Sequence, residues 1–410
     1  MPTDCISYSE TNYFSKLILD YLEKKEELSP FYHRFPEIGN FEAQIKEKQQ
    51  SFSSENRKVL VESLKKQYNG VEISDATLNH IEVLSKDTTF TITTGHQLNL
   101  FTGPLYFLYK IISVINLTKI LKKKHPEYDF VPIYWMATED HDFAEINYFN
   151  LNGKKFQWNS TEKGAGIDAV GYLSTEGLKE VFELFSSEIG GGKDAEYLKF
   201  LFKNAYLKHS NLTEATRYLA NELFKEYGLV IMGAQQPELK KLFIPFAENE
   251  LLEQRSFKTT KENTEKLSNL GYNVQVNPRE INLFYLNNGY RERIIKRDGR
   301  FYVHEKQIEW TKEEIIAELH EQPQHFSPNV MMRPLFQEVI LPNLCYIGGG
   351  GELAYWMELK DYFEAENVPF PMLLLRNSAL LQTEKQKEKR KKLDISNKEL
   401  FLKQHELINR

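Results

Sequence analysis

Cysteine is nearly absent from this sequence of 410 residues, which contains only Cys5 and Cys345. Two cysteines cannot build a disulfide framework or a thiolate zinc site. Cys345 lies among apolar residues with no histidine nearby, so we interpret it as a buried structural thiol rather than a nucleophile.

Long apolar runs and an excess of positive charge are also missing. No stretch approaches the ~20 apolar residues of a membrane span, and the opening MPTDCISYSE is too polar for a secretory signal. The net charge of -6 leaves no basic footprint for nucleic acid. With 41% hydrophobic and 13% aromatic residues, the chain can fill a sizeable core. These features predict a soluble, cytoplasmic protein that binds neither membrane nor nucleic acid.

Residues 88–147 are the most informative segment. A β-branched strand pattern at 88–94 is followed by a polar loop, a long apolar helix pattern from Leu105, and a second strand at 130–137. This order predicts a β-α-β unit of a parallel sheet. Ligands of such sheets bind at the carboxyl ends of the strands, where helix N-termini and loop amides can hold anions.

The rest of the pattern predicts an α/β fold: a Rossmann-like parallel-sheet core with two inserted subdomains and a C-terminal coiled-coil helix. Strand patterns are expected at NVQV (273–276), NLFYL, RERIIKR and RFYV, with a hairpin at Asp298-Gly299, and later at 339–347 and 368–376. The expected organisation is an N-terminal helical segment (1–87), three core parts (88–150, 228–250 and 327–376), a mainly helical insertion (151–227), a mixed insertion with a small β hairpin (251–326) and the start of a coiled coil (377–410).

The tail from Asn377 reads as a single charged helix. Leu393, Leu400 and Leu407 recur every seven residues, which indicates the beginning of a coiled-coil seam. Its Lys/Arg cluster is interpreted as a solvated helix face.

The first group of candidate site residues follows the first strand. A histidine at a strand-to-helix turn can donate to a phosphate or a developing oxyanion, although it can also merely cap the helix. No G-x-G-x-x-G dinucleotide motif is present. The group comprises Thr94, Gly95, His96, Gln97, Asn99 and Gly103.

The second group follows the second strand and comprises Glu139, Asp140, His141 and Asp142. Four ionisable side chains after an apolar strand cannot all be buried without partners. Alternation along an extended chain predicts that one pair faces a ligand amine or a divalent ion. A solvated turn is the alternative, and we assign no metal ligand from this pattern.

The third group is a glycine run between a strand and a helix. Consecutive glycines expose backbone amides that can form an anion nest at a positive helix end; a flexible linker is the alternative. Arg333 is a natural cation for a phosphate or carboxylate, or else part of a structural ion pair. The group comprises Arg333, Gly348, Gly349, Gly350, Gly351, Glu352 and Tyr355.

At these places the sequence resembles the cysteine-adding ligase family of bacillithiol biosynthesis. The segments that carry the resemblance span roughly Thr88 to Ser378: TTGHQLNLFTGPLYFLYKII, VPIYWMATEDHDFAEIN, SPNVMMRPLFQEVILPNLCYIGGGGELAYWMELK and VPFPMLLLRNS. The resemblance implies a Rossmann core like that of class I aminoacyl-tRNA synthetases and pantothenate synthetase. It also implies connecting insertions and a coiled coil that forms a homodimer.

The implied reaction joins cysteine to the amine of glucosaminyl-malate, with ATP or another nucleotide as the activator. The glycine run and His96-Gln97 would hold phosphate or carboxylate. Glu139, Asp140 and Asp142 would position the amine or a metal, and one of them would accept its proton.

Two departures from the family pattern are visible. Many members carry Gln where His96 stands, so an imidazole is not expected to be strictly required. Family members also continue beyond this length, so we expect either a fragment or a shortened variant. Two other functions remain open: a metal-dependent hydrolase that uses His96, Asp140, His141 and Asp142, and a non-enzymatic coiled-coil scaffold.

Overall fold

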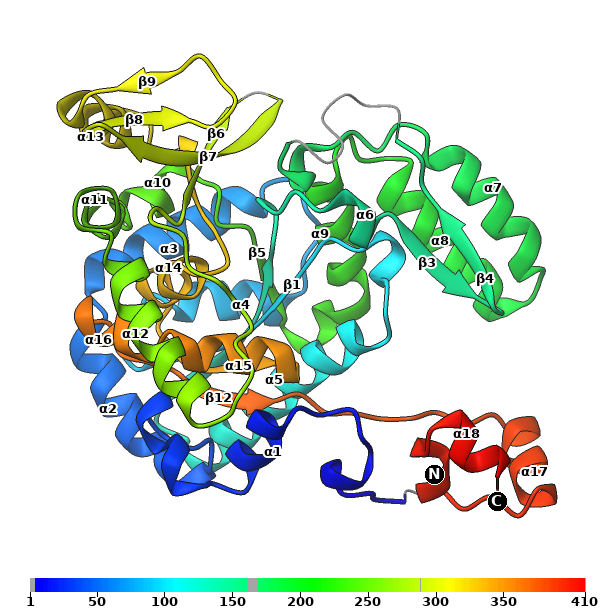
Figure 1. The fold of residues 1–410 in the computed structure, drawn as a ribbon. Coiled ribbons are helices and arrows are strands. Elements are labelled where there is room, and N and C mark those ends of the chain that lie inside the picture. Colours follow the sequence, from blue (N-terminus) through cyan, green and yellow to red (C-terminus); the bar gives the residue numbers. More distant parts are fainter. Residues whose placement is uncertain (1–3, 161–167, 288, 410) are drawn as a thin grey trace.

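A central sheet of five parallel strands organises the protein (Figure 1). The computed structural model describes residues 4–160, 168–287 and 289–409. The sheet order is β12 (Met372–Leu375), β11 (Asn343–Gly348), β1 (Thr89–His96), β2 (Asp129–Met136) and β5 (Val230–Met232). From β1 the chain adds β2 and β5 on one side and β11 and β12 on the other, so the strand order reverses between β1 and β11.

The predicted β-α-β unit is confirmed. Helix α5 (Tyr106–Lys124) connects β1 to β2. On one face of the sheet, Phe90 and Ile92 of β1 pack with Val114 and Leu117 of α5 and with Phe41 of α2 (Phe41–Ser51). Each such side chain contributes roughly 1.5–3 kcal/mol by leaving water. Because helices cover both faces of the sheet, strands such as β2 and β5 are mainly apolar runs, whereas β1 alternates buried threonines with Phe90 and Ile92.

The N-terminal region is helical and irregular, as predicted. Its helices are α1 (Lys16–Leu22), α2 (Phe41–Ser51), α3 (Ser54–Gln67) and α4 (Asp75–Val83). Ser15, Ser53 and Ser74 each accept a hydrogen bond from a backbone amide in the first turn of α1, α3 and α4.

Between β2 and β5 lies a mostly helical segment, drawn in green in Figure 1. A short hairpin turns at Asn152-Gly153, and both residues have positive φ. The elements are α6 (Phe143–Ile146), β3 (Tyr148–Leu151), β4 (Lys154–Gln157), α7 (Leu178–Ile189), α8 (Lys193–Tyr206) and α9 (Leu212–Phe224).

After β5 come three helices and an antiparallel sheet of order β10-β6-β7-β8-β9. Asp298 and Gly299 both have positive φ at the β7–β8 turn, as the Asp-Gly pair predicts. The elements are α10 (Pro237–Lys241), α11 (Ile244–Glu253), α12 (Arg255–Asn269), β6 (Leu283–Asn287), β7 (Tyr290–Arg297), β8 (Arg300–Val303), β9 (Glu309–Trp310), α13 (Lys312–Glu321) and β10 (Phe326–Pro328).

The predicted strand at 273–276 is wrong. This segment is irregular, and the backbone amides of Gln275 and Val276 donate to the buried carboxylate of Glu358, at 2.6 and 3.3 Å. A long-range side chain thus provides the hydrogen bonds that a strand partner would have supplied.

The predicted strand at 339–347 begins too early. Val339 lies inside helix α14 (Arg333–Ile340), and the strand starts at Asn343. Pro342 lacks an amide hydrogen and restricts Leu341 to extended backbone (φ -121°, ψ 137°), so the helix must end first. The remaining helices are α15 (Gly350–Glu358) and α16 (Lys360–Ala365).

The single helix predicted for the tail is also wrong. The tail forms α17 (Glu384–Lys392), a 3-10 turn and α18 (Gln404–Ile408), drawn in red beside the N-terminal segment in Figure 1. Asp394 has a φ of 52° and Ser396 caps the next turn. Short polar side chains of this kind compete with helical hydrogen bonds. Leu393, Leu400 and Leu407 fall on separate turns, so the described part of the tail contains no coiled-coil seam.

Candidate active site

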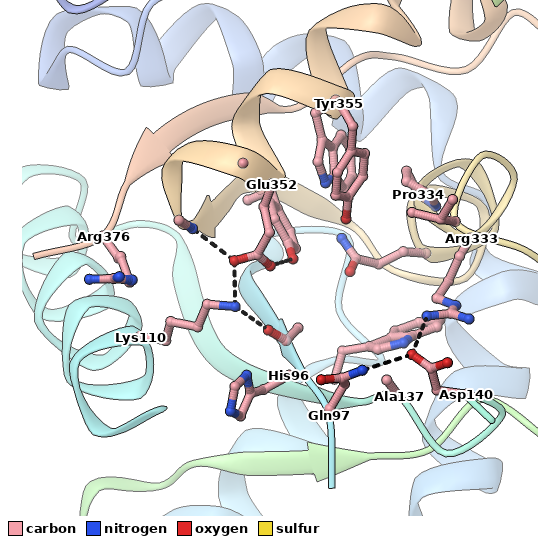
Figure 2. Close-up of a pocket in the computed structure, with 18 of the residues that line it drawn as sticks. His96, Gln97, Lys110, Ala137, Asp140, Arg333, Pro334, Glu352, Tyr355 and Arg376 are labelled. Carbon is pink, nitrogen blue, oxygen red and sulfur yellow. Dashed lines mark hydrogen bonds and ion pairs between the residues drawn. The ribbon is translucent and has the colours of Figure 1, made fainter. Parts of the chain in front are cut away.

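A cavity of about 540 Å³ opens at the carboxyl ends of four of the parallel strands (Figure 2). It lies where the strand order reverses, which is the position predicted for ligands of open parallel sheets. Its lining residues include Gly95 and His96 at the end of β1 and Gln97 just after it, Ala137 and Asp140 after β2, Gly349, Gly350, Gly351 and Glu352 after β11, and Arg376 after β12.

Lys110 and Glu352 form an ion pair in the wall of this cavity. The Lys110 ammonium is buried and lies 2.5 Å from a carboxylate oxygen of Glu352 and 2.8 Å from the carbonyl oxygen of Gly95. The hydroxyl of Tyr346 donates to the other oxygen of Glu352 at 2.7 Å. Burial and the Glu352 charge raise the pKa of Tyr346 well above its ordinary value, so the hydroxyl remains a donor. A Cβ at residue 95 would lie 3.1 Å from this hydroxyl, which explains the glycine there.

The glycine run forms a helix N-terminus rather than the predicted nest. None of the glycines from 348 to 351 has a positive φ, which the alternating nest conformation requires. The Gly349 amide donates to Glu352 at 2.8 Å, so the carboxylate of the protein itself already accepts this bond. The first amides of α15 still point their partial positive charge at the cavity.

The other glycines of the run have different surroundings. Gly348 lies at the end of β11, away from the cavity, where a Cβ would meet Tyr346, Glu352 and Leu353 at 2.9–3.0 Å. A Cβ at residue 350 would lie 3.4 Å from Ile18 of α1, whereas a Cβ at residue 351 would meet only the side-chain oxygen of Gln275, at 4.0 Å.

His96 and Arg376 line the same side of the cavity as Lys110. The Nε2 atom of His96 is buried, and no described residue hydrogen-bonds to it. Burial, together with the charges of Lys110 and Arg376, lowers the pKa of His96 well below its ordinary value. The ring is therefore neutral at neutral pH. The Arg376 guanidinium lies 4.8 Å from the centre of the Tyr106 ring and donates to the Asn377 carbonyl at 3.0 Å.

Asp140, Gln97 and Arg333 form a second polar group, on the opposite side of the cavity from Arg376 in Figure 2. The Gln97 amide donates to Asp140 at 3.2 Å, and the Arg333 guanidinium lies 3.8 Å from the same carboxylate. Burial alone would raise the pKa of Asp140, but Arg333 and Arg291 outweigh it and lower the pKa below its ordinary value. Asp140 is therefore ionised.

The other three members of the acidic group lie outside this cavity. Glu139 is buried and pairs with Lys240 at 2.8 Å. The ring of His141 contacts Arg291 at 3.1 Å, and its side chain is 46% exposed. Asp142 caps α6 by accepting the Glu145 amide at 3.2 Å. The sequence pattern thus predicted one cavity residue of four.

Three members of the first group serve the local backbone instead of the cavity. The Thr94 hydroxyl donates to the Ile347 carbonyl at 2.7 Å, between β1 and β11. Asn99 donates to the Glu145 carbonyl at 3.2 Å. Gly103 has a φ of 59°, and a Cβ there would lie 2.5 Å from that of Asn99. The proposed ligand-binding roles of these three residues are not supported by their positions.

Lys110, Tyr106, Tyr346 and Arg376 were not among the residues predicted from sequence. The position of Lys110 in the sequence could have indicated a buried charge, because it falls three residues after Phe107 and four before Val114, on the apolar face of the helix. The position of Arg376 could likewise have indicated a site residue, since it directly follows an apolar parallel strand.

The described residues contain no group of three or more His, Cys, Asp or Glu side chains placed to hold a metal ion. His96 and Asp140 both line the cavity, but His141 and Asp142 do not. Within the part of the chain that the structure describes, no helix is long and apolar enough to cross a membrane.

Comparison with known proteins agrees with this architecture. Residues 1–377 match the family model described as "Bacillithiol biosynthesis BshC, N-terminal Rossmann-like domain". The chain belongs to the BshC family. Proteins named "Putative cysteine ligase BshC" align with nearly all of it: that of Christiangramia forsetii is 67% identical over 410 residues, that of Flavobacterium johnsoniae 59% over 409, and that of Cytophaga hutchinsonii 41% over 402.

The alignments cover 100%, 100% and 98% of this chain, and 76%, 76% and 74% of those relatives. The resemblance inferred from the motifs is thereby confirmed at the level of the BshC family, and so is the Rossmann-like character of the core.

Proposed function

We propose that this BshC protein is a ligase that joins the carboxyl group of cysteine to the amine of glucosaminyl-malate, with ATP or another nucleotide as the activator. The observation that carries this proposal is the cavity at the strand ends, which is lined by three cations, Lys110, Arg333 and Arg376, and by the N-terminus of α15. Two carboxylates, Asp140 and Glu352, also line it. With His96 neutral, the site has a surplus of positive charge that fits anionic substrates.

Amide formation needs an activated carboxyl group with an anionic leaving group. A bound nucleotide would supply that activation through its phosphates. Lys110 and Arg376 would stabilise the negative charge, together with the first amides of α15. The neutral ring of His96 would donate or accept a single hydrogen bond there.

The charged groups around Glu352 are held in place by hydrogen bonds within the protein. Lys110 and Tyr346 hold the Glu352 carboxylate in place, and Gly349 holds it to the start of α15. Donors that are fixed before the substrate arrives need little reorganisation during the reaction.

The hydrolase alternative has less support, because the four residues it requires do not converge on one point. A chelator-sensitive, nucleotide-independent hydrolysis would nevertheless select it. The scaffold alternative would be selected by a cavity that binds none of the proposed substrates.

Self-association through the tail remains a proposal. Leu380, Leu381 and Leu393 are 59–65% exposed and Ile408 is 73% exposed, and such a set of apolar side chains favours a protein partner. Sedimentation velocity across a range of concentrations tests it: Leu381→Asp should shift any dimer towards monomer.

The decisive experiment incubates the purified chain with cysteine, glucosaminyl-malate and ATP and measures the amide product by mass spectrometry. Omission of each component in turn should abolish the product. Replacement of ATP by other nucleoside triphosphates identifies the activator. Product that forms without any nucleotide would contradict the proposed activation.

A further inference from the structure

The ion pair between Arg333 and Asp140 in the cavity differs from the buried pair between Lys240 and Glu139. Arg333 and Asp140 approach only to 3.8 Å, which is too far for a hydrogen bond. By contrast, Lys240 contacts Glu139 at 2.8 Å and also donates to the Phe326 carbonyl at 3.0 Å. The ammonium of Lys240 thus donates hydrogen bonds to two protein oxygens, whereas Arg333 and Asp140 form no hydrogen bond with each other.

The unused capacity lies on both partners. The guanidinium of Arg333 carries five N–H donors, yet no hydrogen bond joins it to any residue in the described ranges, although its side chain is only 23% exposed. The Asp140 carboxylate accepts the His141 amide at 2.8 Å and the Gln97 amide at 3.2 Å. A carboxylate has about four acceptor sites, so Asp140 can accept further donors from the cavity.

A ligand that carries an ammonium and a carboxylate close together can place its ammonium against Asp140 and its carboxylate against Arg333. The α-ammonium and α-carboxylate of a free amino acid are attached to one carbon atom. An ammonium on Asp140 and a carboxylate on Arg333 would form two charge-assisted hydrogen bonds at once. Neither partner alone would distinguish an amino acid from a simple amine or acid.

We propose that Asp140 and Arg333 recognise the zwitterion of the amino acid substrate, Asp140 through its α-ammonium and Arg333 through its α-carboxylate. This inference rests on the proposed ligase function, because that function identifies the amino acid substrate as cysteine. Gln97 positions Asp140 by donating to it. The carboxylate on Arg333 faces the cavity that Lys110 and Arg376 also line, so an activating phosphate can reach it.

The test compares three thiols by isothermal titration calorimetry on the intact chain. L-Cysteine carries both charges, cysteamine lacks the carboxylate, and 3-mercaptopropionate lacks the ammonium. The wild-type protein should bind cysteine at least ~10-fold more tightly than either analogue, since a charge-assisted hydrogen bond is stronger than a neutral one and each analogue loses one of them. Equal affinities, or no binding of cysteine, would overturn the proposal without the need for any variant.

Two variants assign the charges to residues. Asp140→Asn should erase the preference for cysteine over 3-mercaptopropionate but keep the preference over cysteamine. Arg333→Gln should do the reverse. Asp142→Asn is the matched control, because Asp142 lies two residues from Asp140 but outside the cavity, and it should keep both preferences.

The outcomes separate this inference from the proposed function. Amide product with unchanged preferences in Asp140→Asn and Arg333→Gln would overturn zwitterion recognition and leave the ligase intact. An unchanged cysteine-over-cysteamine preference in Arg333→Gln would mean that Arg333 holds another substrate. The predicted binding preferences without any amide product would contradict the ligase and support the amino-acid site. If Arg333→Gln does not fold, Arg333→Lys should retain a weakened preference over cysteamine.

Discussion

The ammonium of Lys110 lies 2.5 Å from the carboxylate of Glu352, a residue in the first turn of α15. One residue comes from the helix after β1 and the other from the helix after β11, so the ion pair joins the two strands between which the sheet order reverses. The same ammonium binds the Gly95 carbonyl, which places a buried charge directly at the ligand site.

Lys110→Met should reduce ligase activity by ~100-fold or more, the scale seen when one stabilising donor is removed from an active site. It should also lower stability, because Glu352 loses its cation. Initial rates and urea denaturation measure the two effects. Lys123→Met, at an exposed position of the same helix, is the control and should change neither. Full activity in Lys110→Met would exclude Lys110 from the site.

Asp140→Asn and Asp142→Asn should have opposite consequences. Asp140 lines the cavity as an anion, so loss of its charge should reduce activity at least ~100-fold. Asp142 caps α6, and Asn is an equally good cap, so activity and melting temperature should stay close to those of the wild type. Steady-state rates for both variants decide the matter. Equal losses would show that the whole acidic segment acts together.

His96→Gln should retain more activity than His96→Ala. The imidazole is neutral because burial and two nearby cations lower its pKa, so the role open to it at neutral pH is hydrogen bonding. Gln provides a donor and an acceptor, whereas Ala provides neither. The readout is kcat and KM between pH 6 and 8. If both variants are equally inactive, a titrating imidazole is required and the hydrogen-bonding role is wrong.

Gly349→Ala and Gly351→Ala separate cavity shape from helix propensity. A Cβ at 349 would lie 3.4 Å from the Glu352 carboxylate and 3.7 Å from Arg376, so it should obstruct an anion and weaken its binding. A Cβ at 351 would meet only the side-chain oxygen of Gln275, at an ordinary contact distance of 4.0 Å, and Ala there should stabilise the helix by about 0.5–1 kcal/mol. Titration with ATP and thermal melting test both. Unchanged ATP affinity in Gly349→Ala would place the phosphates elsewhere.

Glu358 should make stability depend on pH. Burial raises its pKa to about 7, although the amides of Gln275 and Val276 limit the rise. The folded protein therefore binds more protons than the unfolded chain between pH 4.5 and about 7. The free energy of unfolding should fall as pH rises through this window, by up to roughly 3 kcal/mol.

The matched variant is Glu358→Gln, whose amide does not titrate. Urea denaturation of both proteins from pH 5 to pH 8 should show that the stability of the wild type relative to Glu358→Gln decreases with pH. Parallel curves would mean that the carboxyl titrates normally in the folded protein.

Errors of the sequence interpretation have identifiable physical causes. The residues at 273–276 alternate like a strand, but their amides bind Glu358, a residue more than 80 positions away in the chain. Val339 belongs to α14, which continues to Ile340 and ends before Pro342, so the strand starts at Asn343, four residues later than the apolar pattern predicts. In the tail, the heptad spacing of the leucines predicts one helix. The polar side chains of Asp394 and Ser396 interrupt that helix.

Local sequence patterns were enough to predict the β-α-β unit, the parallel sheet and polar groups at the strand ends, where the cavity lies. Apolar periodicity, a glycine turn and polar residues after a strand are local features, and local hydrogen bonding and burial decide them. Motifs such as TTGHQLNLFTGP were also sufficient to identify the BshC family.

Which polar side chains share the cavity depends on long-range packing and could not be read from local patterns. Asp140 faces it while Asp142 caps a helix, although the two are separated by a single residue. Lys110 and Arg376 line the same cavity although they are far apart in the chain. Glu139 instead forms an ion pair with Lys240 outside this cavity. A buried charge must find a partner, and the partner is chosen by how helices and strands pack rather than by position in the sequence.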